Sequence, residues 1–177
     1  MAMNQIVNVN ASFGIGKDGD LLCHIPEDMR FFREMTAGKT VVMGRKTLLS
    51  MPGGRPLKGR RNIVLSRSKD KYASESFSED AEGTSLCYVS GIEELLSMLP
   101  SDTSDVFVIG GEAIYRLLLP CCDICYVTKN DCGLEADTFY PDLDKDPDFE
   151  IVSESERKLH NGISYRFCTY KRKEATA

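Results

Sequence analysis

The chain has 177 residues, of which 42% are hydrophobic and 28% charged, and this composition is typical of a globular protein that buries a full core. Its net charge of −5 argues against a nucleic-acid-binding protein, because such proteins usually carry a basic surplus. The sequence shows neither an apolar run of the roughly 18–20 residues that a membrane span needs nor a secretion signal. We therefore expect one domain over residues 1–177, in a monomeric cytoplasmic protein with no nucleic-acid or membrane partner.

The seven cysteines are expected to be reduced thiols, because the chain has no secretion signal. Cys122 and Cys125 form a C-x-x-C motif, but a zinc site would need two further ligands. The sequence has no second C-x-x-C, and its only histidines are His24 and His160. We therefore predict no metal and no redox role for this motif.

Short apolar runs alternate with helical patterns along most of the chain. Strands are predicted at residues 5–11, 40–44, 61–65, 86–89 and 105–109, and helices at 26–36, from 45, at 92–99 and at 112–118. Residues 13–23 are predicted to be a glycine-rich loop and residues 69–85 a polar surface loop with a weak strand. Strands at residues 124–129, 149–156 and 164–170 follow without intervening helices, so we expect antiparallel edges there. This order predicts an α/β fold with a single mixed, mostly parallel sheet flanked by helices and ending in an antiparallel hairpin.

The helix at residues 26–36 carries a candidate catalytic acid. Pro26 suits a first helical turn, and Met29, Phe32 and Met35 recur at a spacing that predicts one buried face. Asp28 borders that face, and a carboxyl group in a pocket with a raised pKa can donate a proton. The alternative is that Asp28 only stabilises the start of the helix, where negative charge is favoured.

Glycines follow several of the predicted strands. Residues 14–19 match G-x-G-x-x-G, but the next helix starts only near Pro26, so a loop over a site is favoured over a dinucleotide-binding turn. Gly110 and Gly111 end an apolar strand, where they suit either a phosphate cradle or a tight turn. Polar groups follow two other strands, and together these strand ends favour a polyanionic nucleotide as ligand; they are Arg45, Lys46, Thr47, Ser66 and Arg67.

Taken together, the ordered segments of this chain resemble dihydrofolate reductase. The resemblance covers nearly the whole chain and rests on the order and spacing of GIG at residues 14–16, IPEDMRFF at 25–32, VMGRKT at 42–47, GRPL at 54–57, GRRN at 59–62, VIGG at 108–111 and ADT at 136–138. It implies hydride transfer from NADPH to C6 of 7,8-dihydrofolate and protonation of N5, which gives 5,6,7,8-tetrahydrofolate. Antifolate inhibitors are then expected ligands.

The resemblance also implies roles for individual residues. Asp28 matches the family's single pocket acid, which holds the pterin and promotes N5 protonation through water, and Thr128 matches the threonine that supports this contact. Arg60 matches the arginine that pairs with the α-carboxylate of the glutamate tail. Leu21 and Cys23 complete the implied catalytic group, and the other implied substrate contacts are Ile6, Asn8, Met29, Phe32, Met51, Leu57 and Ile109.

For the cofactor, Arg45, Lys46 and Thr47 match the loop at the phosphates, and Ser66 and Arg67 match the pocket of the 2′-phosphate. The arginine in that pocket is the physical reason to expect NADPH rather than NADH. In this family the glycine pair is joined by a cis peptide bond. The other implied cofactor contacts are Asn8, Ile15, Gly16, Gly44, Leu65, Ile109, Gly110, Gly111, Glu112, Ala113, Ile114 and Tyr115.

The chain departs from the family pattern just ahead of the acidic helix. It contains no tryptophan, and Cys23 stands where many members use an indole N–H to hold a water near the pterin. Leu22 stands where proline is frequent in the family, and Leu48 stands where tryptophan is frequent. Ala113 stands where some relatives carry an arginine that contacts the cofactor. Two other functions were weighed: a related riboflavin-pathway pyrimidine reductase, which lacks the acid at this position, and a non-catalytic pteridine- or nucleotide-binding protein, which only Cys23 suggests.

Overall fold

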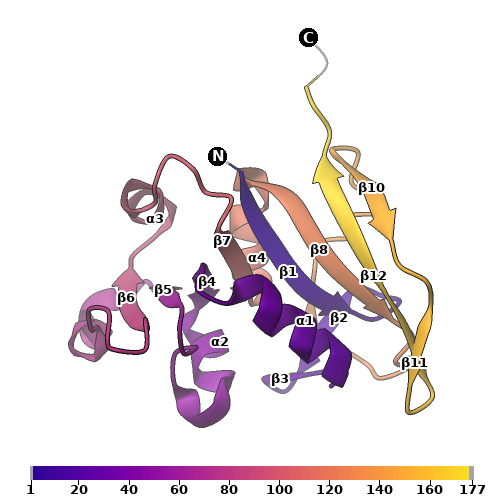
Figure 1. Cartoon of the computed structure of the whole chain (residues 1–177), viewed down its shortest axis with the longest axis horizontal. Helices are drawn as coiled ribbons and strands as arrows, with labels where there is room; N and C mark the ends of the chain where they lie inside the picture. Colours follow the sequence, from indigo (N-terminus) through magenta and orange to yellow (C-terminus); the bar gives the residue numbers. More distant parts are fainter. Residues whose placement is uncertain (1, 176–177) are drawn as a thin grey trace.

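The computed structural model describes residues 2–175, and its main element is a nine-stranded mixed sheet. The strands are β1 (Met3–Val9), β4 (Thr40–Gly44), β5 (Arg61–Leu65), β6 (Ser85–Val89), β7 (Val106–Gly110), β8 (Cys122–Asn130), β10 (Phe149–Glu154), β11 (Lys158–His160) and β12 (Ile163–Arg172). Their spatial order is β10-β12-β8-β1-β7-β4-β5-β6, with β11 paired to β12 (Figure 1). From β8 to β6 all neighbours are parallel, whereas β12 runs antiparallel to β8, β10 and β11. The predicted fold class is confirmed.

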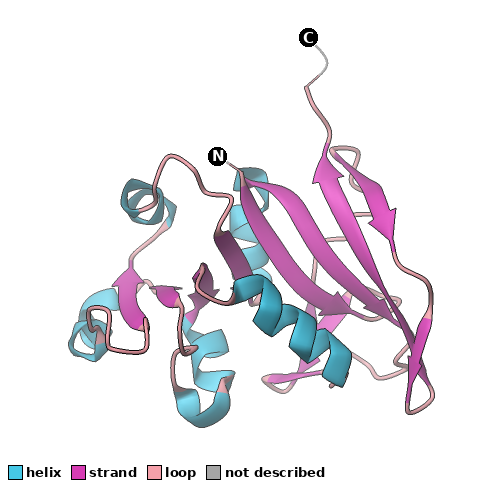
Figure 2. Ribbon diagram, viewed as in Figure 1, coloured by secondary structure: helices cyan, strands magenta, loops and turns pink. Residues whose placement is uncertain are grey.

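Helices cover both faces of this sheet (Figure 2). They are α1 (Pro26–Thr36), α2 (Arg45–Ser50), α3 (Ile92–Met98) and α4 (Glu112–Leu118), with short 3-10 turns η1 (Pro52–Gly54), η2 (Lys69–Glu75) and η3 (Leu119–Cys121). Because strand side chains alternate between faces, neighbouring residues enter different cores. Val41 and Met43 pack with α1 and α2, whereas Val42 packs with α3 and α4. Figure 1 agrees, with α1 in front of the sheet and α4 behind it.

The glycine-rich segment at residues 13–23 is not the unpaired loop that was predicted. It forms β2 (Gly14–Lys17) and β3 (Asp20–Leu21), which join β9 (Thr138–Phe139) in a second sheet of order β3-β2-β9. A Cβ atom at Gly16 would lie 2.7 Å from the Asp20 carbonyl oxygen, so glycine permits the close strand approach. No helix begins within residues 14–19, whereas a dinucleotide-binding turn would need a helix to start there.

The strand predicted at residues 124–129 also differs from expectation. It forms part of β8, which lies inside the sheet and runs parallel to β1 rather than as an antiparallel edge. The reason is that α4 and η3 carry the chain back across the sheet, making β7, α4 and β8 a crossover unit. The other two late strands, β10 and β12, are antiparallel to each other, and β12 is also antiparallel to β8. Only β10 lies at an edge of the sheet.

The polar stretch at residues 69–85 is more ordered than predicted, since it contains η2 and a single bridge between Phe77 and Leu86. Cys122 and Cys125 lie on β8, and their side chains are fully buried in the hydrophobic core. Within residues 2–175, none of the helices combines the length and the apolar character that crossing a membrane requires.

Candidate active site

The candidate site lies where several parallel strands end, on the face of the sheet that carries α1. Gly44, Leu65 and Gly110 are the last residues of β4, β5 and β7, and these three strands are neighbours or next neighbours in the sheet. Asn8 and Thr128 lie opposite one another near the ends of β1 and β8. Ligands of α/β proteins bind at such carboxyl ends, so the topology brings the predicted substrate and cofactor residues to one edge.

Asp28 lies in the first turn of α1, and two side chains of the sheet hold its carboxylate. The Thr128 hydroxyl donates to Oδ1 at 2.6 Å, and the Asn8 amide Nδ2 donates to Oδ2 at 3.0 Å. The two donors share one face because their positions are in register on neighbouring strands. The predicted proximity of Asp28 and Thr128 is therefore present, with Asn8 as an additional partner.

The surroundings of Asp28 differ from those of the adjacent acid, Glu27. Burial raises the pKa of Asp28, and the hydrogen bonds from Thr128 and Asn8 only partly oppose that effect. Glu27 turns away and accepts hydrogen bonds from Lys158 at 2.6 Å and Tyr165 at 2.5 Å, which lower its pKa. Glu27 thus fits a helix-start acid, whereas Asp28 fits a pocket acid.

The apolar wall beside Asp28 is built differently from the predicted helix face. Met29 is 36% exposed, so the prediction that it belongs to a buried stripe is wrong. Phe31 packs instead, with ring centroids 4.9 Å from Phe167 and 6.3 Å from Tyr126. Phe31 and Met35 are four residues apart and therefore lie on the same face of α1. The predicted pattern of Met29, Phe32 and Met35 does not include Phe31. The other predicted wall residues join the same hydrophobic cluster, namely Ile6, Phe32, Met51, Leu57 and Ile109.

Cys23 is buried just before α1, in a small cluster with Ile25 and Tyr165. Burial and the neighbouring Cys132 raise the pKa of its thiol to about 11. The thiol therefore stays protonated at neutral pH and does not act there as a base. Leu21, at the end of β3, is 52% exposed. The catalytic role of these two residues stays a prediction.

Arg60 is held beside the C-terminal end of α1 by neutral acceptors. Its guanidinium donates to the carbonyl oxygens of Arg33 at 3.0 Å and Lys58 at 2.6 Å, and to the Thr36 hydroxyl at 3.2 Å. Within residues 2–175 it makes no ion pair. Burial and the nearby Arg33 lower its pKa, as expected for a fixed cation that lacks an anionic partner.

The predicted phosphate-binding residues lie in two different environments. Arg67 is exposed just after β5, whereas Arg45 already donates to Glu75 through both terminal nitrogens, at 2.5 and 3.1 Å. The Arg45 guanidinium also lies 3.8 Å from the centre of the Tyr72 ring and donates to the Tyr88 hydroxyl. Its charge is therefore largely compensated within the protein, so an incoming phosphate would compete with Glu75.

The other predicted cofactor residues cluster around the ends of β4 and β7. The peptide bond between Gly110 and Gly111 is cis, as the resemblance implied. A Cβ atom at Gly111 would lie 3.4 Å from the Thr47 hydroxyl, and one at Gly44 would lie 3.0 Å from Ile114. Leu65 and Tyr115 are buried, and Lys46 and Ala113 are exposed. Glu112 pairs with Arg116 at 3.5 Å, and Ile15 and Gly16 lie on β2 of the second sheet.

Comparison with known proteins agrees with this geometry. The family model for dihydrofolate reductase matches residues 2–172. The chain belongs to the dihydrofolate reductase family. It is 33% identical to the Bacillus subtilis dihydrofolate reductase over 97% of this chain and 95% of that protein. It is also 38% identical to the dihydrofolate reductase of Mycobacterium tuberculosis strain H37Rv over 97% of this chain and 99% of that protein, and 41% identical to that of Mycobacterium leprae over 89% and 90%.

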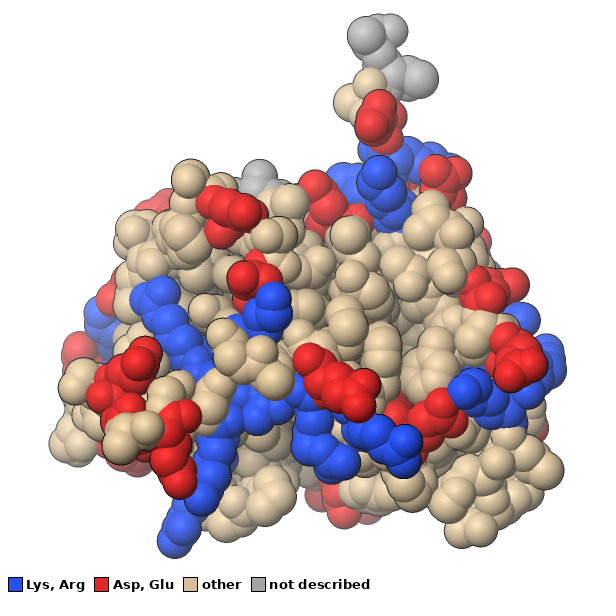
Figure 3. Space-filling model, viewed as in Figure 1, with Lys and Arg blue, Asp and Glu red and all other residues tan. Residues whose placement is uncertain are grey.

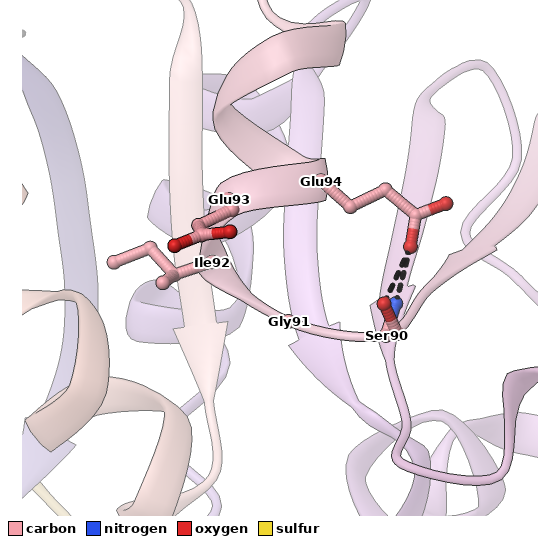
Figure 4. Close-up of a pocket in the computed structure, with 5 residues that line it drawn as sticks. All are labelled: Ser90, Gly91, Ile92, Glu93 and Glu94. Atoms are coloured by element: carbon pink, nitrogen blue, oxygen red, sulfur yellow. Dashed lines mark hydrogen bonds between the residues drawn. The ribbon is translucent and has the colours of Figure 1, made fainter.

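A shallow hollow lies at the carboxyl end of β6, beside the end of β5 that leads into Ser66 and Arg67. It is lined by residues 90–94, where β6 passes into α3 (Figure 4). Glu94 turns toward Ser90 and accepts hydrogen bonds from its backbone N–H and its hydroxyl (Figure 4). Lys69 also donates to Glu94, at 2.6 Å. None of the predicted substrate or cofactor residues lines this hollow, and its two carboxylates do not suit a phosphate.

Lys and Arg side chains gather over α1 and α2 on the face of the molecule that Figure 3 shows, despite the net charge of −5. An anionic ligand would therefore meet a locally basic approach to the site. Sequence reasoning included Asn8 among the site residues but missed the contact of its side chain with Asp28, and it missed Asn130 altogether. The sequence carries no signal that would pair them, because β1 and β8 contain several other polar residues.

Proposed function

We propose that this chain catalyses the NADPH-dependent reduction of 7,8-dihydrofolate to 5,6,7,8-tetrahydrofolate. Membership of the dihydrofolate reductase family supports the reaction. The observation that carries the mechanism is Asp28, a half-buried carboxyl group with a raised pKa that Thr128 and Asn8 hold at the strand ends. The pterin ring would bind against Asp28 and the apolar wall, with its glutamate tail directed toward Arg60.

The protein's own groups would bind, orient and protonate. NADPH supplies the hydride that is added to C6. Asp28 holds the pterin amino group and ring nitrogen and, through water, favours the proton at N5. Thr128 fixes the Asp28 carboxylate, and Ile6, Phe32 and Ile109 exclude bulk water from the ring. Arg67 and Ser66 would hold the 2′-phosphate, and Thr47 and the backbone at Gly111 would approach the pyrophosphate.

The direct test is the loss of NADPH absorbance when purified protein is mixed with 7,8-dihydrofolate, with identification of tetrahydrofolate as the product. Turnover with NADPH that exceeds turnover with NADH is expected. Absence of turnover by folded protein with either cofactor would exclude the proposed activity.

Replacing Arg60 with Leu is expected to raise KM for dihydrofolate by about 10- to 100-fold, because hydrogen bonds to a charged group contribute about 1.5–3 kcal/mol. Steady-state kinetics should show no such rise with a dihydropteridine that lacks the glutamate tail. Arg55→Leu, which removes an exposed arginine from the same loop, is the matched control. Equal KM changes for both substrates would assign Arg60 to loop structure rather than to tail binding.

Replacing Arg67 with Leu should reduce the preference for NADPH over NADH by about 10- to 100-fold in the ratio of kcat/KM values. The reason is that only NADPH carries the 2′-phosphate that the guanidinium would bind. Lys71→Leu removes an exposed cation from the neighbouring η2 and should leave the ratio unchanged. If the ratio does not move in Arg67→Leu, another residue recognises the 2′-phosphate.

A further inference from the structure

A chain of hydrogen bonds runs from the backbone beyond β8 to the Asp28 carboxylate. The backbone N–H of Cys132 donates to Asn130 Oδ1 at 2.9 Å, and Asn130 Nδ2 donates to Asn8 Oδ1 at 2.6 Å. Asn8 Nδ2 then donates to Asp28 Oδ2 at 3.0 Å. Asn130 is buried and Asn8 half-buried, so water competes little for these bonds.

The direction of this chain is fixed at its backbone end. A backbone N–H can only donate, so the Asn130 oxygen must face Cys132 and its NH₂ group must face Asn8. The Asn8 oxygen is then the acceptor, which leaves the Asn8 NH₂ group directed at Asp28. Asn8 therefore cannot turn an acceptor toward Asp28 without breaking its bond to Asn130.

We propose that Asn8 is a positioning residue for the reaction, which presents a fixed donor to Asp28, and that Asn130 sets the orientation of its amide. This inference rests on the proposed role of Asp28. A carboxylate accepts from both donors, with Thr128 on one oxygen and Asn8 on the other, and each oxygen keeps a second lone pair for a ligand N–H. A proton on Oδ2 would meet the Asn8 N–H, donor against donor. Asn8 therefore favours the ionised carboxylate, against the effect of burial.

The other ionisable groups that face Asp28 do not titrate between pH 5 and 9. The pKa of Cys23 is raised to about 11 and that of Tyr165 to about 12, and burial raises the pKa of Tyr115 further. On α1 itself, Glu27 has a lowered pKa and stays ionised. On β8 and β1 the facing groups are the neutral Thr128 and Asn8. These groups therefore do not account for a pH dependence in this range, whereas burial raises the pKa of Asp28.

The test is the pH dependence of kcat/KM for dihydrofolate in Asn8→Leu, which keeps the shape of the side chain but removes its donor. Loss of one hydrogen bond to the charged form should raise the pKa of Asp28, so the pH at which the rate falls to half should rise by about one unit. Asn4→Leu is the matched control, since Asn4 is an amide on the same strand that donates to Ser104 and Val106 instead. Its midpoint should equal that of the parent.

A second variant and a second measurement keep the outcome decisive. Asn130→Ser retains a hydroxyl acceptor for the Cys132 N–H but does not reach Asn8, and it should move the midpoint in the same direction by a smaller amount. Carboxyl ¹³C NMR titration of the ligand-free protein, with Asp28→Asn to identify the resonance, measures the pKa without turnover. An inactive parent would refute the proposed function while this titration still tests Asn8. Unchanged Asp28 pKa values in both Asn8→Leu and Asn130→Ser would overturn the proposal.

Discussion

Asp28→Asn is expected to lower kcat for dihydrofolate reduction at neutral pH by at least about 100-fold, the lower range of what a positioned acid contributes. In the parent, burial raises the pKa of Asp28, so the protonated fraction decreases as pH rises through that pKa. The rate of hydride transfer should decrease over the same range because the protonated substrate complex is depleted. An amide is neutral at every pH, so this decrease should be absent from the variant.

Single-turnover rates measured across pH, in parent and variant, separate this effect from product release. Glu27→Gln is the matched control, because it neutralises the adjacent carboxyl group, which pairs with Lys158 of β11 rather than with Thr128 and Asn8. That variant should keep the pH dependence of the parent. If Asp28→Asn retains the parental profile, Asp28 is not the group that controls protonation.

Local patterns in the sequence were sufficient for most of the fold. The helix predicted at residues 26–36 matches α1, because Pro26 marks its first turn. The strands predicted at residues 40–44 and 61–65 match β4 and β5, because short apolar runs mark them. The two larger errors concern pairing, which local patterns do not encode. Gly14 and Gly16 suggest a loop, but they lie in β2, where the close approach of neighbouring chain segments leaves no room for a Cβ atom. The sequence of β8 does not show that α4 returns the chain so that β8 pairs in parallel with β1.

The site residues that could be predicted are those that match the pattern of the dihydrofolate reductase family. Asp28, Thr128 and the glycine pair were placed by resemblance, and the structure brings Asp28 and Thr128 into contact. The Asn8–Asn130 pair was not predictable, because it depends on the register between β1 and β8 and on a turn after β8. The pairing of Arg45 with Glu75 likewise joins residues 30 positions apart in a polar stretch without periodicity.

Gly110→Ala is expected to lower the free energy of unfolding by about 3 kcal/mol, since backbone strain and overpacking each contribute about 1–3 kcal/mol. The φ angle of Gly110 is +119°, a conformation that side chains disfavour. An added Cβ atom would also lie 3.1 Å from the Tyr115 ring. That ring cannot move away freely, because its hydroxyl donates to the Ile6 carbonyl oxygen at 2.7 Å and its edge packs on Tyr140.

Urea unfolding of the ligand-free protein measures this effect independently of activity. Gly91→Ala is the matched control, because Gly91 has extended backbone angles and an added Cβ atom would have no neighbour within 4 Å. Its stability should stay within about 0.5 kcal/mol of the parent. Equal stability of Gly110→Ala and the parent would contradict the packing at the end of β7. A loss of stability confined to Gly110→Ala would show that the end of β7 tolerates no side chain at residue 110. Because this strand end positions Gly111 opposite Thr47, NADPH binding should weaken together with stability.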